Sequence, residues 1–314
     1  MRKRESYGKS TCTYNCVNFN GCFYKKIKFV SDEAIAGIKN IASNVFLPAV
    51  IFNALATADF NKDSMFIFCT SMFVLVTGFA AGFVIKKMYK KPYRDYIPYI
   101  TVTFEGGMLG YALAQVLVGA DKLYYIATID LAGALFSFTV WITMLEHLCN
   151  KNSREGKEKG IVKSILTTPT LIAAVLGLVF GLTGLGHMIQ KSEAGQVYEN
   201  VVEMFSAPLT PIILISLGYG LSISKENIKD ALLIILQRVC VVGIAVAVGF
   251  LIFGRHISFT PALTASFILY FCLPPSFILS VYVKEEKSRD VVSCVLSLYM
   301  ILTLAVFCVL LAKF

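Results

Sequence analysis

Long apolar stretches without charged residues constrain this chain more than any other feature of its sequence. About 20 mostly apolar residues are needed for a helix to cross the ~30 Å hydrocarbon core of a membrane. Five stretches of this kind contain no Asp, Glu, Lys or Arg: 40–58, 64–85, 204–224, 257–283 and 291–312. With four further apolar runs and their flanking turns, the sequence predicts nine transmembrane helices. These are expected at about 32–57, 64–88, 95–119, 122–148, 163–186, 201–223, 228–253, 260–283 and 289–313.

The composition agrees with a membrane protein and excludes several other classes. Hydrophobic residues make up 56% of the chain and charged residues 16%, against roughly 25% charged residues in ordinary soluble domains. Such a chain would expose large apolar patches in water and aggregate. This argues against a soluble enzyme, a disordered protein and a secreted disulfide scaffold. The apolar runs are continuous, whereas an outer-membrane barrel has alternating strands of about 10 residues, so the fold class is an all-α integral membrane protein.

The basic residues are distributed unevenly between the two sides of the predicted helices. The formal net charge is +9, which by itself would be compatible with nucleic-acid binding. However, 22 of the 29 Lys and Arg residues fall in the N-terminal segment and in alternate loops, and five fall on the opposite side. Cytoplasmic loops of membrane proteins collect Lys and Arg. We therefore expect a multi-pass protein of the cell membrane, in contact with lipid and not with nucleic acid, with a cytoplasmic N-terminus and an extracellular C-terminus.

The order of the predicted helices indicates an internal repeat. Residues 1–30 form a polar segment, expected to be cytoplasmic, that lacks the apolar core of a signal peptide. A first repeat of four helices at 31–149 and a second of five helices at 163–314 are joined by a cytoplasmic linker at 150–162. Corresponding features recur at an offset of about 160–170 residues, as in inverted-repeat transporters. The fifth helix has no counterpart, so the odd count is explained if one helix is missing at the front.

One helix in each repeat is predicted to be broken, at 104–110 in the first repeat and at 272–276 in the second. Proline removes a backbone donor and clashes with the preceding turn, and glycine costs about 1 kcal/mol in a helix interior. The backbone groups freed inside a membrane persist only when they are buried in protein or line a cavity. Backbone at Gly106, Gly107, Pro274 and Pro275 is therefore a candidate binding site, with a kink that only shapes packing as the alternative.

Three ionisable residues fall centrally within the predicted membrane spans, where such residues are functional candidates. Glu105, at the first break, could bind and release a proton, ligate Na⁺, or simply cap loose backbone amides. Asp130 could face the pore as part of the site, or lie close enough to the interface to be hydrated. Arg238 could neutralise an anionic substrate, or form a structural ion pair with Asp130 or Glu105.

Four stretches together resemble the auxin efflux carrier family of membrane transporters, and Arg238 and the proline pair also fit. The stretches are Val45–Phe52, Glu105–Gly110, Thr168-Pro169-Thr170 with Gly177 and Gly181, and Ala207-Pro208 through Ser222. The resemblance implies an inverted-repeat fold with two crossing helices, transport of a small organic anion such as malonate, malate or an auxin-like acid, and a homodimer. Two departures are that members usually have ten helices and that they typically carry Asn at the position of Glu105.

The resulting hypothesis is a secondary active transporter that moves a mono- or dicarboxylate by alternating access. Because the chain contains no G-x-x-x-x-G-K-[ST] motif, an ion gradient, of H⁺ or Na⁺, would drive it, and no other cofactor or metal is expected. An enzyme is not expected, since the three His residues all fall at predicted helix ends and no aspartate pair is evident. The alternative is a membrane sensor or an inactive, non-transporting relative of the same fold.

Overall fold

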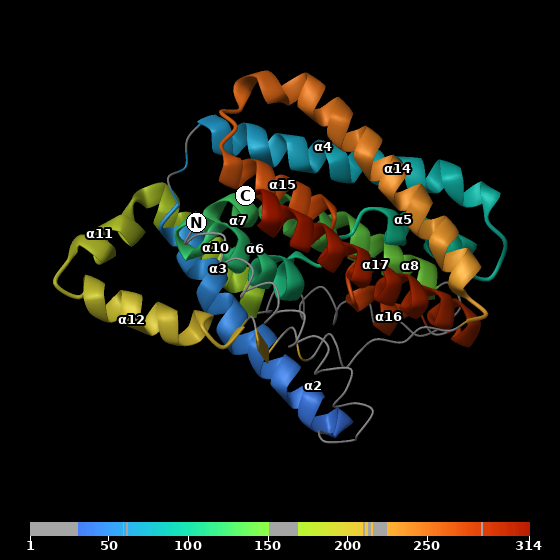
Figure 1. Ribbon diagram of the computed structural model, residues 1–314, viewed down its shortest axis with the longest axis horizontal. Helices are drawn as coiled ribbons and strands as arrows, with labels where there is room; N and C mark the ends of the chain where they lie inside the picture. Colours follow the sequence, from blue (N-terminus) through green and yellow to red (C-terminus); the bar gives the residue numbers. More distant parts are fainter. Residues whose placement is uncertain are drawn as a thin grey trace.

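The computed structural model describes residues 31–58, 60, 62–150, 169–209, 211–212, 215, 225–283 and 285–314, and every regular element in these ranges is helical (Figure 1). The predicted segment 1–30 and residues 151–162 of the predicted linker lie outside the described residues. Within these described ranges, four helices are long and apolar enough to cross a membrane: Lys62–Met88, Ala120–Leu145, Ile228–His256 and Glu286–Lys313. The described residues give a fifth span if the pair Ile172–Thr183 and Leu185–Lys191, bent by 77°, is counted as one. The all-α membrane fold is thus confirmed, whereas the count of nine is not.

Several predicted helices correspond to elements of the structure, some of which are continuous and some interrupted. The first corresponds to three consecutive elements, α2 (Asp32–Ile41), η1 (Ala42–Phe46) and α3 (Leu47–Ala56). The other long elements are α4 (Lys62–Ile85), α7 (Leu123–Phe136) with η6 (Ser137–Trp141) and α8 (Ile142–Asn150), α14 (Ile228–Phe253) and α17 (Glu286–Lys313). Short turns of helix join them: η2 (Lys86–Met88), η3 (Tyr93–Tyr96), η5 (Ala120–Lys122) and η7 (Gly254–His256).

The region between the fifth and sixth predicted helices differs from the expectation. We expected a loop at 187–200, but the structure has α11 (Leu185–Lys191) and α12 (Gly195–Ser206) there, after α10 (Pro169–Thr183). The bend occurs at Gly184, whose φ of 75° places it in the left-handed region. Glycine adopts that conformation without the steric cost of a Cβ, so the chain turns between α10 and α11 and helix resumes.

One group of helices consists of α3 with α10, α11 and α12, seen together in Figure 1. Gly177 and Gly181 on α10 face the main chain of α3, where a Cβ at either position would collide with carbonyl oxygens of Phe52 and Leu55. Small residues at this spacing let helix backbones approach closely in membranes. The Tyr198 hydroxyl adds a hydrogen bond to Asn53 Oδ1 at 2.8 Å. Glycine spacing therefore determines the tight α3–α10 contact.

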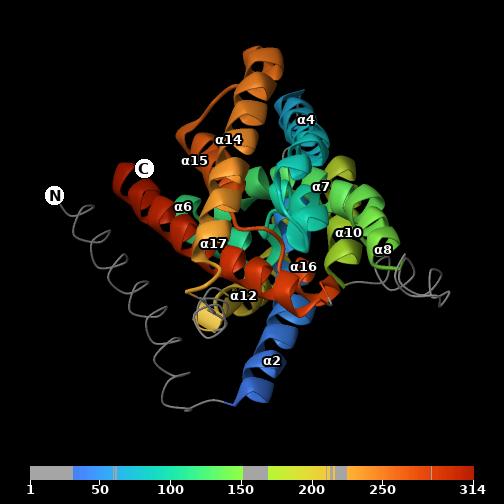
Figure 2. The ribbon, with the colours of Figure 1, turned by 90° about the vertical axis from the view of Figure 1, so that its right-hand side faces the viewer.

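A second group is built from α4, α7, α14 and α17 and encloses the two interrupted helices. In this group α14 packs on α4 and α17, and α4 packs on α7 (Figures 1 and 2). The first interrupted helix comprises α5 (Ile97–Thr101), η4 (Gly106–Gly110) and α6 (Tyr111–Val118), and the second comprises α15 (Pro261–Phe271) and α16 (Ile278–Tyr282). Because α15 packs on both α6 and α7, the two interruptions are brought into one region.

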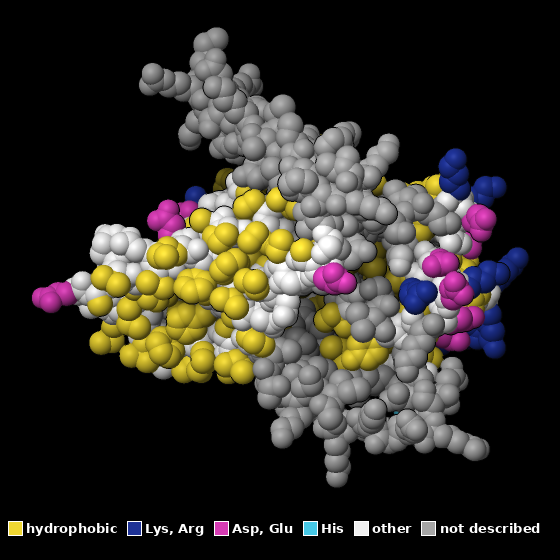
Figure 3. Space-filling view, turned by 90° about the horizontal axis from the view of Figure 1, so that it is seen from below, with side chains coloured by type: hydrophobic (Ala, Val, Ile, Leu, Met, Phe, Trp, Pro, Cys, Tyr) yellow, Lys and Arg dark blue, Asp and Glu magenta, His cyan; other side chains and the backbone are white. Residues whose placement is uncertain are grey.

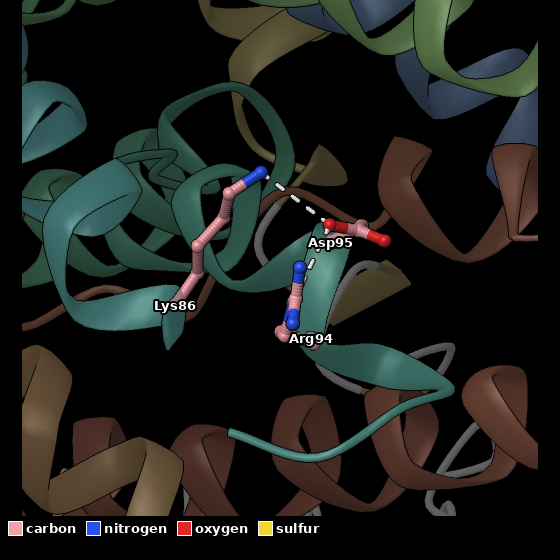
Figure 4. Close-up of polar contacts among 3 residues, drawn as sticks. All are labelled: Lys86, Arg94 and Asp95. Atoms are coloured by element: carbon pink, nitrogen blue, oxygen red, sulfur yellow. Dashed lines mark hydrogen bonds and ion pairs between the residues drawn. The ribbon is translucent and has the colours of Figure 1, made fainter. Parts of the chain in front are cut away.

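The surface separates apolar and charged side chains. Figure 3 shows a broad hydrophobic patch on one face, with Lys and Arg side chains gathered at one end of the molecule. Large apolar side chains on α12 and α14 are strongly exposed, among them Met204, Ile244 and Leu251, as expected for a surface that contacts lipid. At the polar end, Asp95 lies 3.4 Å from Lys86 Nζ and 3.9 Å from Arg94 Nε (Figure 4). These residues belong to the loop that we predict to be cytoplasmic.

Candidate functional site at the two helix interruptions

The two interruptions contact each other directly. The Glu105 amide donates to the Pro274 carbonyl oxygen at 2.9 Å, and the Phe277 amide donates to Glu105 Oε2 at 2.8 Å. The Ser276 amide donates to Thr103 Oγ1 at 3.3 Å. Three hydrogen bonds therefore join segments far apart in the sequence, and they satisfy backbone groups that each interruption leaves without helical partners.

Arg238 holds the helix ends that precede the two interruptions. It is fully buried on α14, and its guanidinium donates to the carbonyl oxygens of Ile100, Thr103 (2.6 Å) and Leu273 (3.1 Å). The rings of Phe104 and Tyr299 lie 4.7 and 4.9 Å from its Cζ. Carbonyl groups give a helix C-terminus a partial negative charge, so one arginine compensates both α5 and α15.

These contacts differ from both sequence interpretations of Arg238. Its hydrogen bonds run to main-chain carbonyls, and in the described part of the chain the ion pairs involve Lys86, Arg94 and Asp95, not Arg238 with Asp130 or Glu105. With no exposed surface, the guanidinium is also not available to a substrate in this conformation. The structure therefore assigns Arg238 to positioning the interruptions.

Two further side chains satisfy carbonyls at the same helix ends, and sequence reasoning missed both. Trp141 Nε1 donates to the Tyr99 oxygen at 3.1 Å, and Thr303 Oγ1 donates to the Cys272 oxygen at 2.6 Å. Trp141 is the one tryptophan in the chain. A buried indole N–H usually has an acceptor, and this was the available signal for Trp141. Thr303 carries no such signal, because threonine in an apolar helix usually bonds to its own backbone.

Asp130 is a residue of α7, and its carboxylate lies beside Gly106, where η4 begins after the first interruption. Its Oδ1 accepts a 3.0 Å hydrogen bond from the Tyr270 hydroxyl in the last turn of α15, and the buried Tyr111 hydroxyl also contacts its carboxylate. A Cβ on Gly106 would collide with this carboxylate, and a Cβ on Gly133 would collide with the Tyr270 hydroxyl. The two missing side chains leave the space that the Asp130–Tyr270 pair occupies. Tyr111, Tyr270 and Gly133 were not predicted.

The remaining predicted residues surround the same region. Pro274 and Pro275 are buried in the second interruption. Gly107 borders α3, because its Cβ would lie 3.4 Å from Leu47 Cδ2, so the first interruption reaches the boundary between the two helix groups. The structure thus brings all seven predicted site residues to one region. Among the described residues, no group of three or more His, Cys, Asp or Glu side chains is arranged to hold a metal ion.

The chain supplies counter-charges for the polar ends created by the interruptions. Arg238 compensates the two C-terminal ends, and the Glu105 carboxylate accepts from an amide just before α16. The Asp130 carboxylate lies beside Gly106, the first residue of η4. Helix N-termini attract anions, and both are already next to a carboxylate.

Comparisons with known proteins agree with this architecture. The sequence model of a family described as "Membrane transport protein" matches residues 16–312. An "Uncharacterized transporter" of Methanothermobacter thermautotrophicus is 22% identical over 293 residues, which is 90% of each chain. The "Uncharacterized transporter MJ1031" of Methanocaldococcus jannaschii is 26% identical over 217 residues, which is 64% of this chain and 65% of that protein. The family match covers nearly the whole chain and confirms the resemblance seen in its motifs. The protein therefore belongs to the membrane transport protein family, that of the auxin efflux carriers.

Proposed function

We propose that the protein is a secondary active transporter that moves a small organic anion, a mono- or dicarboxylate, across the cell membrane. Membership of a transport family establishes the general class. The observation that supports the location of the site is the hydrogen bond between the Glu105 amide and the Pro274 oxygen. It joins two interrupted helices within the apolar bundle, and discontinuous helices form the substrate sites of many secondary transporters.

Alternating access would arise from movement between the two helix groups. The α3–α10 group is held by close backbone contact, while the interrupted helices are tied to α14 and α17 by Arg238 and Thr303. Gly107 and Leu47 meet where the groups adjoin. A displacement at this boundary would open the interruptions first to one side of the membrane and then to the other. An ion gradient would supply the energy, because the sequence has no P-loop motif.

Uptake into proteoliposomes tests this proposal. Purified protein is reconstituted, and uptake of labelled malonate, malate and indole-3-acetate is measured with an imposed gradient of H⁺ or Na⁺. We expect saturable uptake of at least one acid, and exchange of that acid when it is present on both sides. Protein-free vesicles correct for diffusion of the neutral acids. Absence of both uptake and exchange for all three acids, with protein that remains monodisperse, would contradict transport of small organic anions and favour a sensor.

Substitution at the boundary between the helix groups supplies a matched pair for the same assay. Gly107→Ala adds a methyl group at ordinary contact distance from Leu47 and should retain uptake. Gly107→Leu extends a larger side chain toward Leu47 and should reduce uptake, and the thermal unfolding temperatures of both variants are measured to separate this effect from a loss of folding. Equal uptake by the two variants would argue against a site at this boundary.

A further inference from the structure

We propose that Asp130 is the binding site of the coupling ion, and that this ion is a proton taken up together with the anionic substrate. The inference rests on the proposed function and deepens it. Sequence reasoning left the coupling ion open between H⁺ and Na⁺ and considered Glu105 first. The surroundings of the two carboxylates in the structure distinguish their roles.

Glu105 has the surroundings of a positioning residue. Its side chain is 8% exposed, its Oε2 accepts from the Phe277 amide, and its own amide is bonded to Pro274. Both contacts cross from one interruption to the other. Protonation and release of this carboxylate would loosen the junction that the site is built on, so we assign Glu105 to holding the two interruptions together.

Asp130 has surroundings suited to repeated protonation. It is partly exposed, and it lies on the continuous helix α7 and not within an interruption. The titratable groups that face it are Tyr270 of α15, Tyr111 of α6 and Glu105 of the segment before η4. Tyrosine hydroxyls can donate to a carboxylate and can also accept from a carboxyl group. Both states of Asp130 can therefore be hydrogen-bonded in place.

The space for the Asp130–Tyr270 pair is built from two different elements. Gly106 begins η4 and Gly133 lies on α7, and a Cβ at either position would collide with one member of the pair. A carboxylate that merely pointed at the bilayer interface would require neither gap. Together with Tyr111, the pair also connects the interrupted helices, because Tyr270 lies in the last turn of α15 and Tyr111 begins α6. A change at Asp130 is thus transmitted to both of them.

The charges predict the direction of coupling. While Asp130 is ionised, it lies beside the start of η4 and repels a second carboxylate there, and like charges at close range are strongly unfavourable in a low dielectric. Binding of one proton to a carboxylate oxygen of Asp130 forms the neutral acid and removes that repulsion. The substrate carboxylate can then interact with the freed half-helix end. Proton and anion binding therefore favour each other, reciprocally, which corresponds to symport.

Net uptake and exchange, compared between wild-type protein and Asp130→Asn, test this inference. Asparagine keeps an acceptor for Tyr270 and resembles the neutral acid. With an acidic exterior, wild type should accumulate labelled malonate above its external concentration. The variant should lose that accumulation by about tenfold or more, within the usual range of coupling factors, yet should still exchange internal for external malonate. Glu105→Gln keeps an acceptor for the Phe277 amide, and whatever uptake it retains should still depend on the proton gradient.

A second variant covers the case in which Asp130→Asn does not fold. Tyr270→Phe removes a donor to the ionised carboxylate, so the pH of half-maximal uptake should shift upward. Accumulation by Asp130→Asn equal to that of wild type would overturn the inference, as would wild-type accumulation driven by Na⁺ at equal pH. If malate or indole-3-acetate is the transported acid, the same comparison is made with it. A wild-type protein that neither takes up nor exchanges any acid would instead overturn the proposed function itself.

Discussion

The two helix interruptions are joined to each other but are built from different chemistry. The first, between α5 and η4, contains Glu105 and Gly106, and thus a charged side chain and a gap filled by Asp130. The second, between α15 and α16, contains Pro274 and Pro275 and contributes main-chain groups to the junction. In the first, the non-helical residues 102–105 precede Gly106, whose missing side chain leaves room for the Asp130 carboxylate. In the second, the backbone bends because proline cannot continue the helix.

On the proposed mechanism, this difference separates a half of the site that can bind and release a proton from a half that only holds the junction in place. The backbone groups of the second interruption carry no proton that could be exchanged near neutral pH, so they present a constant arrangement. The carboxylates are contributed by the first interruption and by α7 beside it. Arg238 is common to both, because it binds carbonyls on each side. Substitutions at these positions should therefore have effects that differ in size and in kind.

The largest effect is expected at Arg238, since both interruptions depend on it. Arg238→Gln leaves three buried carbonyl oxygens with an incomplete set of donors, and removing one partner from a buried charged network typically costs about 3–5 kcal/mol. The thermal unfolding temperature in detergent should fall strongly. The unfolding temperature of Arg238→Lys should lie between those of the parent and Arg238→Gln, because one ammonium cannot reach all three oxygens. The exposed Arg255 provides the control, and Arg255→Gln should unfold like the parent. A normal unfolding temperature for Arg238→Gln would show that the two interruptions do not share this support.

The next effect distinguishes the side-chain contact of the first interruption from the backbone contact of the second. Glu105→Ala removes the acceptor of the Phe277 amide, and losing a hydrogen bond to a charged group costs about 1.5–3 kcal/mol. Pro274→Ala retains the carbonyl that accepts from Glu105 and should cost less than about 1 kcal/mol. Denaturation of both purified variants gives the comparison. If Pro274→Ala proved the more destabilising, the assignment of supporting contacts would have to be reversed.

A smaller but more local effect is expected from filling the gap beside Asp130. Gly106→Ala would force the carboxylate to move, and overpacking of this kind costs about 1–3 kcal/mol. Gly243→Ala on α14 is the matched control, because nothing lies within 4 Å of its added Cβ, and it should be neutral or slightly stabilising. Gly106→Ala should lower both the stability and the proton-driven uptake. Gly243→Ala should lower neither. Normal behaviour of Gly106→Ala would mean that the gap has no role.

The smallest effect is expected at the polar end, away from both interruptions. Lys86→Ala removes the 3.4 Å ion pair with Asp95 (Figure 4), whose side chains are 25% and 35% exposed. Exposed pairs contribute only about 0–1 kcal/mol because water and salt screen them. Thermal unfolding in low and high salt should therefore differ little between this variant and the parent. A loss as large as that of Glu105→Ala would remove the contrast between the interior junction and the exterior.

Much of the helical arrangement was predictable, because it depends on local sequence. The predicted spans 64–88 and 228–253 agree with the observed Lys62–Met88 and α14, since long apolar runs specify membrane helices directly. Gly106-Gly107 and Pro274-Pro275 lie at or beside the two observed interruptions, so the sequence located both of them. The α11–α12 pair was missed, because its polar composition resembles that of a loop and its helices depend on packing beside α3.

The contacts of the candidate site were less predictable, since several of them join residues separated by more than a hundred positions. Arg238 was recognised as a candidate, but its carbonyl partners at the ends of α5 and α15 follow from how α14 crosses those helices. Tyr270 resembles any aromatic residue of an apolar helix, and only packing of α15 on α7 brings its hydroxyl to Asp130. A hydrogen bond requires a distance near 3 Å, which a sequence does not contain.

By itself, the sequence determined that this chain is an all-helical membrane protein, that two of its helices are interrupted, and which carboxylates and arginine lie near the interruptions. These properties follow from hydrophobicity and from the backbone chemistry of glycine and proline, which act over a few residues. The tertiary structure alone decided that Arg238 serves the helix ends and that Glu105 joins the two interruptions. It also decided that Asp130 occupies a gap lined by two glycines. Those roles depend on which helices are neighbours, and the energy of a buried charge is set by the groups that surround it.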